Sequence, residues 1–196
     1  TQNWSLQGTP SRTYCSIVVD ARSCFWTYTL DNTLAATKAL KEGQSVTQTY
    51  TARVSDGFAS VDQTITVTIN GTNDSPVASG TYTHTVNDTA AVDTFTALTG
   101  TLAATDVDTA DTLTWSGSAA GSFGALTVNA NGSYSYAVNA AAVNALQASS
   151  NSLSDNFTVT VTDSQGATAT RSIAMTVVGA NDTPVVTNGT AARAGS

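Results

Sequence analysis

The sequence has 196 residues, of which 36 are Thr, 13 are Asp and only one is Glu, and its formal net charge is −7. Threonine favours strands and aspartate favours turns, so this composition indicates strands joined by acidic loops. The seven basic residues form no stripe that would bind nucleic acid, and no apolar run is long enough for insertion into a membrane.

The first predicted turn, over 19–23, lies between two cysteines, Cys15 and Cys24. Two cysteines are too few for a disulfide scaffold, and their spacing excludes a CxxC redox or zinc motif. The register of the flanking strands decides between a local disulfide and two free thiols, so both alternatives stay open.

The chain repeats itself at a spacing of about 108 residues. The matched blocks, in the same order, are 73–77 (NDSPV) with 181–185 (NDTPV), 26–30 (WTYTL) with 134–138 (YSYAV), and 50–56 (YTARVSD) with 157–163 (FTVTVTD). A period of this length is one domain long, which predicts separate modules rather than the turns of a solenoid.

This period divides the chain into an incomplete first module over 1–74, a complete second module over 75–182, and the opening strand of a next module, or a tail, over 183–196. The first module lacks its opening third, so we expect unpaired strand edges on it. These edges would be paired either by residues of the same protein that lie outside this sequence or by the strands of another chain.

The complete module is predicted to consist of short strands, because β-branched and aromatic residues alternate with small polar ones. The expected strands cover 80–86, 100–104, 111–115, 124–128, 133–138, 156–162 and 167–178. Residues 129–132 (NANG) indicate a hairpin turn, and 139–148 is predicted to be a short helix capped by Asn139. We therefore predict an all-β fold of tandem immunoglobulin-like or cadherin-like β-sandwich modules, with one short helix per module.

The acidic residues are densest at 106–111 (DVDTAD). In an extended loop Asp106 and Asp108 point to the same side, where two like charges a few ångströms apart repel by about 1 kcal/mol in water. A cation between them removes this repulsion, and calcium accepts about six to eight oxygens from carboxylates, amides and carbonyls. The alternative is that the acids only keep a secreted protein soluble.

Further oxygens are expected close to this loop. Asn73 and Asp74 stand at the boundary between the two modules, and Asp163 ends a long strand in the turn at 161–166 (VTDSQG). In an antiparallel sandwich this turn and the loop at 106–111 can lie at the same end. Four carboxylates and one amide would then surround a single junction.

Several motifs in this order carry a resemblance to a known family: 100–108 (GTLAATDVD), Trp115, 134–136 (YSY) and the closing GxNDxPV at 71–77 and 179–185. Together they resemble the VCBS repeat of very large bacterial surface proteins, which is related to cadherin-like modules. The resemblance implies a β-sandwich repeated many times in RTX-type adhesins, which are commonly exported by type I secretion. It also implies calcium at the junctions between modules, and the ligands carried over by position are Asn73, Asp74, Asp106, Asp108 and Asp163.

Glu42 has two possible roles. Its place in 40–42 (LKE) is like that of the Glu that the preceding cadherin module contributes, but a surface Glu that ends a helix fits equally well. The second module has Ala148 or Ser149 at this place, and the linker lacks the earlier Asp of the full cadherin pattern. We therefore expect one or two ions per junction, and a weaker or incomplete site at Asp182.

The expected function is a stalk that extends a bacterial adhesin outside the cell, with neighbouring modules of the same protein as partners. The alternatives are a polysaccharide-binding module and a self-assembling subunit of an extracellular filament or sheath, which would pair with like chains. An enzyme is not expected, because His84 is the single His and no nucleophile motif is recognisable. Trp4, Trp26 and Trp115 are expected to pack in cores rather than to stack on sugars.

Overall fold

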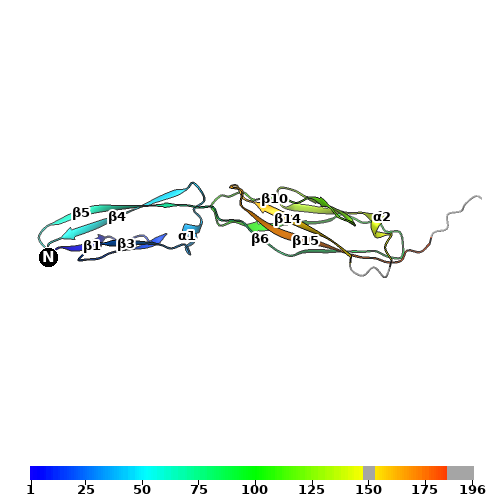
Figure 1. The fold of residues 1–196 in the computed structure, drawn as a ribbon, viewed down its shortest axis with the longest axis horizontal. Helices are drawn as coiled ribbons and strands as arrows, with labels where there is room; N and C mark the ends of the chain where they lie inside the picture. Colours follow the sequence, from blue (N-terminus) through cyan, green and yellow to red (C-terminus); the bar gives the residue numbers. More distant parts are fainter. Residues whose placement is uncertain (148–152, 185–196) are drawn as a thin grey trace, which may run out of the picture. The chain divides into compact units, whose positions relative to one another are not determined.

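The computed structural model describes residues 1–147 and 153–184. These residues form two compact units. The first unit consists of 1–77 together with 104–113 and 161–169, and the second consists of 78–103, 114–160 and the residues from 170 onwards. Both units are built from strands with one single-turn helix each, as Figure 1 shows, so the predicted all-β fold is confirmed.

The first unit contains two sheets. β1 (Asn3–Gln7), β4 (Ser45–Ser55) and β5 (Ser60–Asn70) form an antiparallel sheet in the order β1-β4-β5. β2 (Cys15–Val19) and β3 (Trp26–Leu30) form a two-stranded hairpin, which is followed by α1 (Ala35–Lys38).

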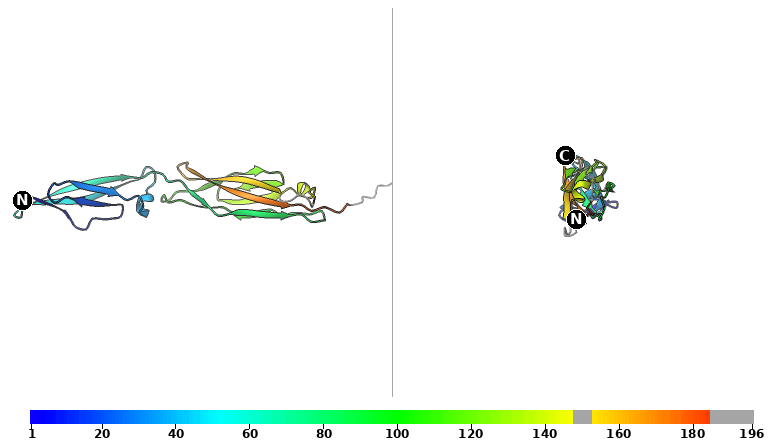
Figure 2. Two further views of the ribbon diagram at one scale, coloured as in Figure 1. Left: turned by 60° about the horizontal axis from the view of Figure 1, so that its bottom comes forward. Right: turned by 90° about the vertical axis from the view of Figure 1, so that its right-hand side faces the viewer.

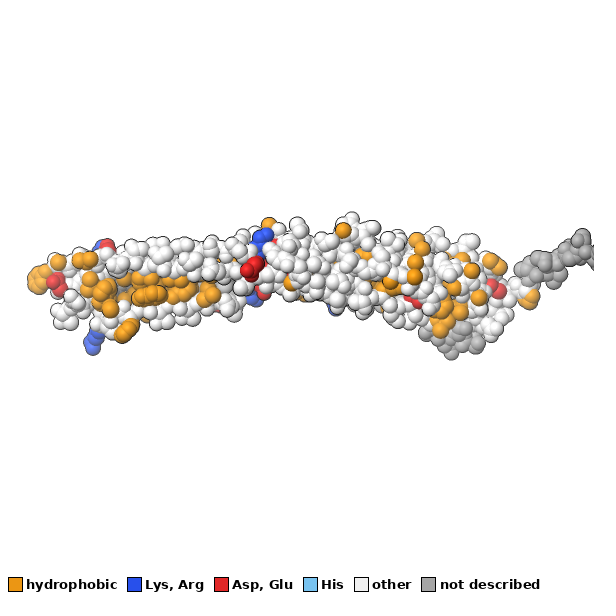
Figure 3. Space-filling model, turned by 45° about the horizontal axis from the view of Figure 1, so that its top comes forward, with side chains coloured by type: hydrophobic (Ala, Val, Ile, Leu, Met, Phe, Trp, Pro, Cys, Tyr) orange, Lys and Arg blue, Asp and Glu red, His pale blue; other side chains and the backbone are white. Residues whose placement is uncertain are grey.

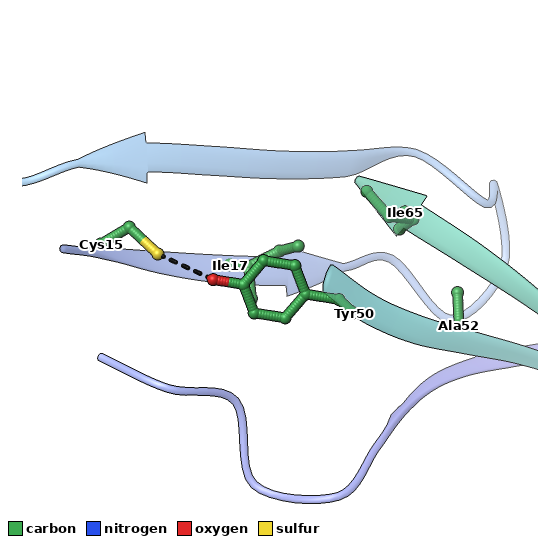
Figure 4. Packing of buried hydrophobic residues seen from close by; sticks show 5 residues of the cluster. All are labelled: Cys15, Ile17, Tyr50, Ala52 and Ile65. Atoms are coloured by element: carbon green, nitrogen blue, oxygen red, sulfur yellow. Dashed lines mark hydrogen bonds between the residues drawn. The ribbon is translucent and has the colours of Figure 1, made fainter. Parts of the chain in front are cut away.

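A small core lies between these two sheets (Figure 4). Alternation along the strands points Tyr50 of β4 and Ile17 of β2 inward, where they meet Ile65 of β5. The phenol of Tyr50 lies 3.1 Å from Sγ of Cys15, and burial raises the pKa of Tyr50 to about 12. Each polar group in this core is therefore paired.

The register of the hairpin settles the state of the two cysteines. Cys15 pairs with Leu30, and Val19 pairs with Trp26 beside the turn that contains Cys24. Cys15 is thus about 13 Å along the strand from the turn, at about 3.3 Å per residue, which is too far for a disulfide. Both cysteines are free thiols, Cys15 buried and Cys24 exposed.

We expect Cys24→Gly to stabilise the first unit by about 0.5–1 kcal/mol, because Cys24 adopts a left-handed backbone with φ of 58°. The matching position of the repeat is Gly132, whose φ is 86°. A higher urea midpoint than that of the wild type checks this expectation. Cys24→Ala removes the thiol but keeps the strain, so an equal gain in that variant would contradict the explanation.

The second unit also consists of two main sheets, seen from another side in Figure 2. One has the order β10-β14-β15-β7, and its strands are β10 (Thr114–Ser116), β14 (Leu153–Thr162), β15 (Thr168–Val178) and β7 (Tyr82–Asn87). The other has the order β11-β12-β13-β8, and its strands are β11 (Ala119–Ala120), β12 (Gly124–Val128), β13 (Ser133–Val138) and β8 (Leu98–Thr101). A short ladder joins β6 (Val77–Ser79) to β9 (Ala103–Thr105).

The core of the second unit is larger than that of the first. Every second residue of β14 and β15 points inward. The residues of this unit with no exposed surface are Tyr136, Val143, Val159, Ile173, Met175 and Val177. Strand alternation places all of them except Val143, which lies on α2, so the sheets of this unit follow closely from the sequence pattern.

Three local predictions have different outcomes. The turn at 129–132 is confirmed by the hydrogen bond from the N–H of Gly132 to the carbonyl of Asn129 at 2.9 Å. Asn139 does cap the second helix, but α2 covers only Ala140–Val143, and residue 148 at the end of the predicted helix lies outside the described residues. Trp115 is buried as expected, whereas Trp26 is 47% exposed, contrary to the prediction of core packing.

Within 1–147 and 153–184, none of the helices has the length and apolar character needed to cross a membrane.

Candidate metal centre

The loop that follows β9 gathers three carboxylates at one point. The carboxylate of Asp106 accepts a hydrogen bond from the N–H of Asp108 at 3.0 Å, and the N–H of Asp111 donates to the carbonyl of Asp108 at 3.4 Å. Ala110 takes a left-handed backbone with φ of 62°. As a result, carboxylate oxygens of Asp106, Asp108 and Asp111 all lie within 4.8 Å of one another.

Two further segments of the first unit reach this loop. The N–H of Asp74 donates to Oδ2 of Asp108 at 2.8 Å, and Nδ2 of Asn73 donates to Oδ2 of Asp163 at 2.9 Å. Asp163 is itself held in the turn between β14 and β15, where its Oδ1 accepts the N–H of Ala167 at 2.8 Å. The linker, the loop and the turn are therefore tied together, and all three belong to one compact unit.

The carboxylates of Asp108 and Asp163 have opposite electrostatic environments. Burial raises the pKa of Asp108, and the charges of Asp106, Asp74 and Asp111 raise it further, while the N–H of Asp74 opposes these effects. The hydrogen bond from Asn73 lowers the pKa of Asp163, together with backbone N–H donors of its turn. The surroundings thus favour the ionised form at Asp163 and disfavour it at Asp108, and a positive charge close to Asp108 would offset the latter effect.

Three oxygens of this cluster are buried and have no hydrogen-bond partner among the described residues: Oδ1 of Asn73, Oδ2 of Asp106 and Oδ1 of Asp108. Native structures rarely leave buried polar atoms without a partner, because each one costs about 1–3 kcal/mol. Asp108 itself is only 5% exposed. An amide oxygen and two carboxylate oxygens at one place are suitable ligands for a hard cation such as calcium.

Asp111 and Lys41 were not among the site residues predicted from the sequence. Nζ of Lys41 lies 3.3 Å from Oδ1 of Asp111, and the hydroxyl of Ser164 donates to the same oxygen at 2.8 Å. Asp111 is therefore neutralised by a lysine, which leaves Asp106 and Asp108 as the acids of the loop without a cation. The DxDxxD spacing of the loop was a usable signal for Asp111, whereas the partnership with Lys41 arises only in the fold.

The structure brings together five of the six predicted residues, namely Asn73, Asp74, Asp106, Asp108 and Asp163. Glu42 is exposed, in a turn after α1, and its side chain makes none of the described hydrogen bonds or ion pairs of the cluster. Glu42 therefore lies in a turn and not at the end of the helix, since α1 ends at Lys38.

A second pair of acids lies in the other unit. Asp88 is 8% exposed, and its Oδ2 accepts the N–H of Ala180 at 3.0 Å. Oδ1 of Asp88 and Oδ1 of Asp182 are both buried without a hydrogen-bond partner in the described chain. Asp182 occupies the position that Asp74 has in the first repeat.

The family model of the bacterial cadherin-like domain matches residues 73–179. This match covers more than half of the chain and includes Asn73, Asp74, the acidic loop and Asp163. The chain therefore belongs to the family of bacterial cadherin-like domains. No curated protein sequence matches it.

Among solved structures the chain is similar to PcdhgB3 EC1-4 at 13% identity, with a TM-score of 0.49 and 90% of this chain and 41% of that chain covered. It is similar to Drosophila N-cadherin EC1-4 at 14% identity, with a TM-score of 0.47 and coverage of 90% and 40%. For human CDH23 EC21-23 the identity is 18%, the TM-score is 0.49 and the coverage is 90% and 58%. The chain thus spans less than two thirds of each of these structures.

Proposed function

We propose that this chain is a structural extender from the stalk of a large, secreted bacterial surface adhesin of the VCBS type, and that calcium bound at the cluster of Asn73, Asp74, Asp106, Asp108 and Asp163 stiffens it. Its partners are neighbouring modules of the same protein. Cadherin-like membership supports an adhesive or structural role outside the cell rather than catalysis.

The observation that carries the proposal is the set of buried, unpartnered oxygens on Asn73, Asp106 and Asp108. Calcium supplies the positive charge that these oxygens lack, and the carboxylates and the amide are the ligand types that it prefers. Without the ion the like charges of Asp106 and Asp108 remain uncompensated, so the chain at 73–74 is less firmly held. With the ion the same oxygens draw linker, loop and turn together.

The proposed organisation keeps an incomplete module over 1–74, a complete module over 75–182, and residues 183–196 as the opening of a further module or a tail. The bound segment 73–74 is then the boundary between two modules. Asp88 and Asp182 would form half of a second, weaker site, whose remaining ligands another module would supply. Asp182 repeats Asp74 at the next boundary, which is the reason for expecting one site per boundary.

We expect 10 mM calcium to stabilise the first unit by about 1.4–2.7 kcal/mol, because an extracellular site with a Kd of about 10⁻⁴–10⁻³ M gains RT ln(1 + [Ca]/Kd). Thermal unfolding in calcium and in EGTA measures this as a rise in the midpoint. The ion binds the folded state only, so the rise should grow with calcium concentration.

Magnesium at the same concentration is the control. It is smaller and requires a stricter octahedral arrangement of ligands, so it should raise the midpoint much less. An equal effect of both ions would indicate general screening of the acids. No shift at 10 mM calcium would contradict the proposal.

A further inference from the structure

Four side chains of the first unit meet between its two sheets. Cys15 lies on β2, Tyr28 lies on β3, and Gln48 and Tyr50 lie on β4. Sγ of Cys15 is 3.3 Å from Oε1 of Gln48 and 3.1 Å from the phenol oxygen of Tyr50, a contact that Figure 4 marks with a dashed line. A nucleophilic thiol is therefore held next to a carboxamide, whose carbon is an electrophile.

Two phenols donate to the oxygen of this carboxamide. The hydroxyls of Tyr28 and Tyr50 each lie 2.8 Å from Oε1 of Gln48. Burial raises the pKa of both tyrosines, that of Tyr50 to about 12, so both phenols stay protonated and able to donate. Donors at about 2.7–3.1 Å from a carbonyl oxygen stabilise the negative charge that develops there when a nucleophile attacks the carbonyl carbon.

The carbonyl carbon of Gln48 is within reach of the thiol. A C=O bond is about 1.23 Å long, so Sγ of Cys15 lies at most about 4.5 Å from this carbon. A near-attack distance is about 3–3.5 Å, and small changes in the side-chain torsions of Cys15 and Gln48 close the remaining gap. Because both groups are held on strands of one unit, the attack is intramolecular, and such reactions reach effective concentrations of about 10⁵–10⁸ M.

The second unit has a different set of side chains at the matching positions. By strand register and by the repeat, the counterparts of Cys15, Tyr28, Gln48 and Tyr50 are, in this order, Gly124, Tyr136, Asp155 and Phe157. There the hydroxyl of Tyr136 donates to Oδ2 of Asp155 at 2.7 Å. A tyrosine hydrogen bond between the sheets is thus common to both units, whereas the thiol, the carboxamide and the second phenol occur together at these positions only in the first unit.

We propose that Cys15 and Gln48 form an internal thioester that joins β2 to β4. Sγ of Cys15 attacks the carbonyl carbon of Gln48, and the new S–C bond replaces the bond between this carbon and Nε2. The thiol proton leaves on that nitrogen as ammonia, and the phenol of Tyr50 beside the sulfur can relay it. No atom is oxidised or reduced, so the step needs no further reagent. The structure shows the thiol before this step.

The first unit offers few nucleophiles that could cleave this bond. Cys15 is only 4% exposed, which limits the access of water to the sulfur. The chain has two lysines, Lys38 on α1 and Lys41, which is paired with Asp111. Figure 3 shows few basic side chains on the face of the first unit that it presents. The thioester links the two sheets of the unit covalently, which does not depend on calcium and goes beyond the role of an extender.

The test is the intact mass of the full chain together with a count of its thiols after unfolding in acidic denaturant. The reacted chain should be lighter by the mass of one ammonia molecule and should show one thiol, that of Cys24, in place of two. Peptide mapping should locate the link between the segments that contain Cys15 and Gln48. Methylamine should then cleave the link, release the thiol and leave an N-methyl carboxamide at position 48.

Three variants separate the roles of the side chains. Cys15→Ala should abolish the loss of ammonia, whereas the matched control Cys24→Ser should leave it unchanged. Tyr50→Phe removes one donor to the carbonyl oxygen and should slow the reaction by about 10²–10³-fold. Phe157 occupies the matching place in the second unit, so the fold accommodates this side chain. The rate is followed after the link has been reopened with concentrated ammonia and the ammonia has been removed.

An unchanged mass with two free thiols in the unfolded wild-type chain would overturn the proposal. A succinimide at an Asn-Gly pair such as Asn70 with Gly71 also loses ammonia, but it leaves both thiols free and persists in Cys15→Ala. That result would overturn the proposal as well. If Tyr50→Phe reacts at the wild-type rate while its thermal unfolding shows a folded chain, the role assigned to the phenol of Tyr50 is wrong.

Discussion

Asp108→Asn is expected to abolish most of the stabilisation by calcium and, in EGTA, to leave the chain as stable as the wild type or more stable. Burial raises the pKa of Asp108, and the charges of Asp74, Asp106 and Asp111 raise it further. The neutral amide removes that repulsion and keeps an oxygen that can accept the N–H of Asp74. Relative to the wild type, the variant should therefore unfold at a lower midpoint in calcium and at an equal or higher midpoint in EGTA.

The size of the loss follows from the linkage between binding and folding. If the substitution weakens binding about 100-fold, 10 mM calcium contributes less than about 0.5 kcal/mol in place of about 1.4–2.7 kcal/mol. A variant that loses stability in EGTA as well would show that Asp108 acts through packing or hydrogen bonds alone.

The pH dependence of the calcium-free chain gives a second readout. A carboxyl whose pKa is higher in the folded than in the unfolded state contributes stability that is present below its unfolded pKa and is lost as the pH rises through the folded value. Asp108 is such a group. The difference in unfolding free energy between wild type and Asp108→Asn should therefore change with pH from the unfolded pKa, near 3.8, up to the raised folded pKa, and be constant above it.

Two substitutions serve as controls. Asp56→Asn changes the residue of the first repeat that corresponds to Asp163, which lies in an exposed turn outside the cluster, so the calcium response should persist. Glu42→Gln separates the two roles considered for Glu42. A full calcium response in this variant assigns Glu42 to the surface, and a loss would make it a ligand.

The acids of the cluster were predictable from local spacing, and their partners were not. Asp106 and Asp108 are two residues apart, so an extended loop points them to one side. The approach of Asn73 and Asp163 to this loop was expected, because in a β-sandwich loops and turns can lie at the same end of the strands. The ion pair of Lys41 with Asp111 joins residues 70 positions apart, and no local pattern indicates such a contact.

The fold was predictable where alternation is strong, and less so where coverage depends on a distant strand. The expected strand at 133–138 matches β13 in full. Trp26 was expected in a core because it aligns with Tyr134, but burial of Tyr134 depends on β8, and no strand of the described residues pairs with β3 in that way. An alignment of repeats predicts the backbone structure of the matched residues. It predicts the burial of their side chains only when the segment that covers them is present as well.

Asp155 is not among the residues predicted from the sequence to have a special role, although its position gave a signal. It lies on β14 in phase with Phe157, Val159 and Val161, so alternation points its carboxylate into the apolar interior. There Asp155 is 5% exposed, and both of its carboxylate oxygens accept hydrogen bonds. A buried acid on the apolar face of a strand has a specific structural task, because burial of a charge without partners is very costly.

The task of Asp155 is to hold the segment between β11 and β12. Its Oδ1 accepts the N–H of Ser122 at 2.7 Å, and its Oδ2 accepts the N–H of Phe123 at 2.9 Å and the hydroxyl of Tyr136 at 2.7 Å. Gly121 gives the carboxylate room, since a Cβ at that position would collide with it. Burial and this carboxylate both raise the pKa of Tyr136, so the phenol remains a donor.

We expect Asp155→Asn to destabilise the second unit by about 2–4 kcal/mol, because an NH₂ group would replace one of two oxygens that face only donors. Tyr136→Phe should cost less, about 1–2 kcal/mol, since it removes a single hydrogen bond to a charged group. Urea unfolding followed by the fluorescence of Trp115, which lies in the second unit, measures both losses.

The exposed pair of Arg53 with Asp62 supplies the control, because surface ion pairs contribute little to stability. Asp62→Asn changes an Asp to an Asn on a strand in the same way, without burial, and should leave the urea midpoint almost unchanged. In the double variant of Asp155→Asn and Tyr136→Phe the losses should be less than additive, because both act on one network. Strict additivity, or an Asp155→Asn variant as stable as the wild type, would contradict the view that a single buried carboxylate holds this segment in place.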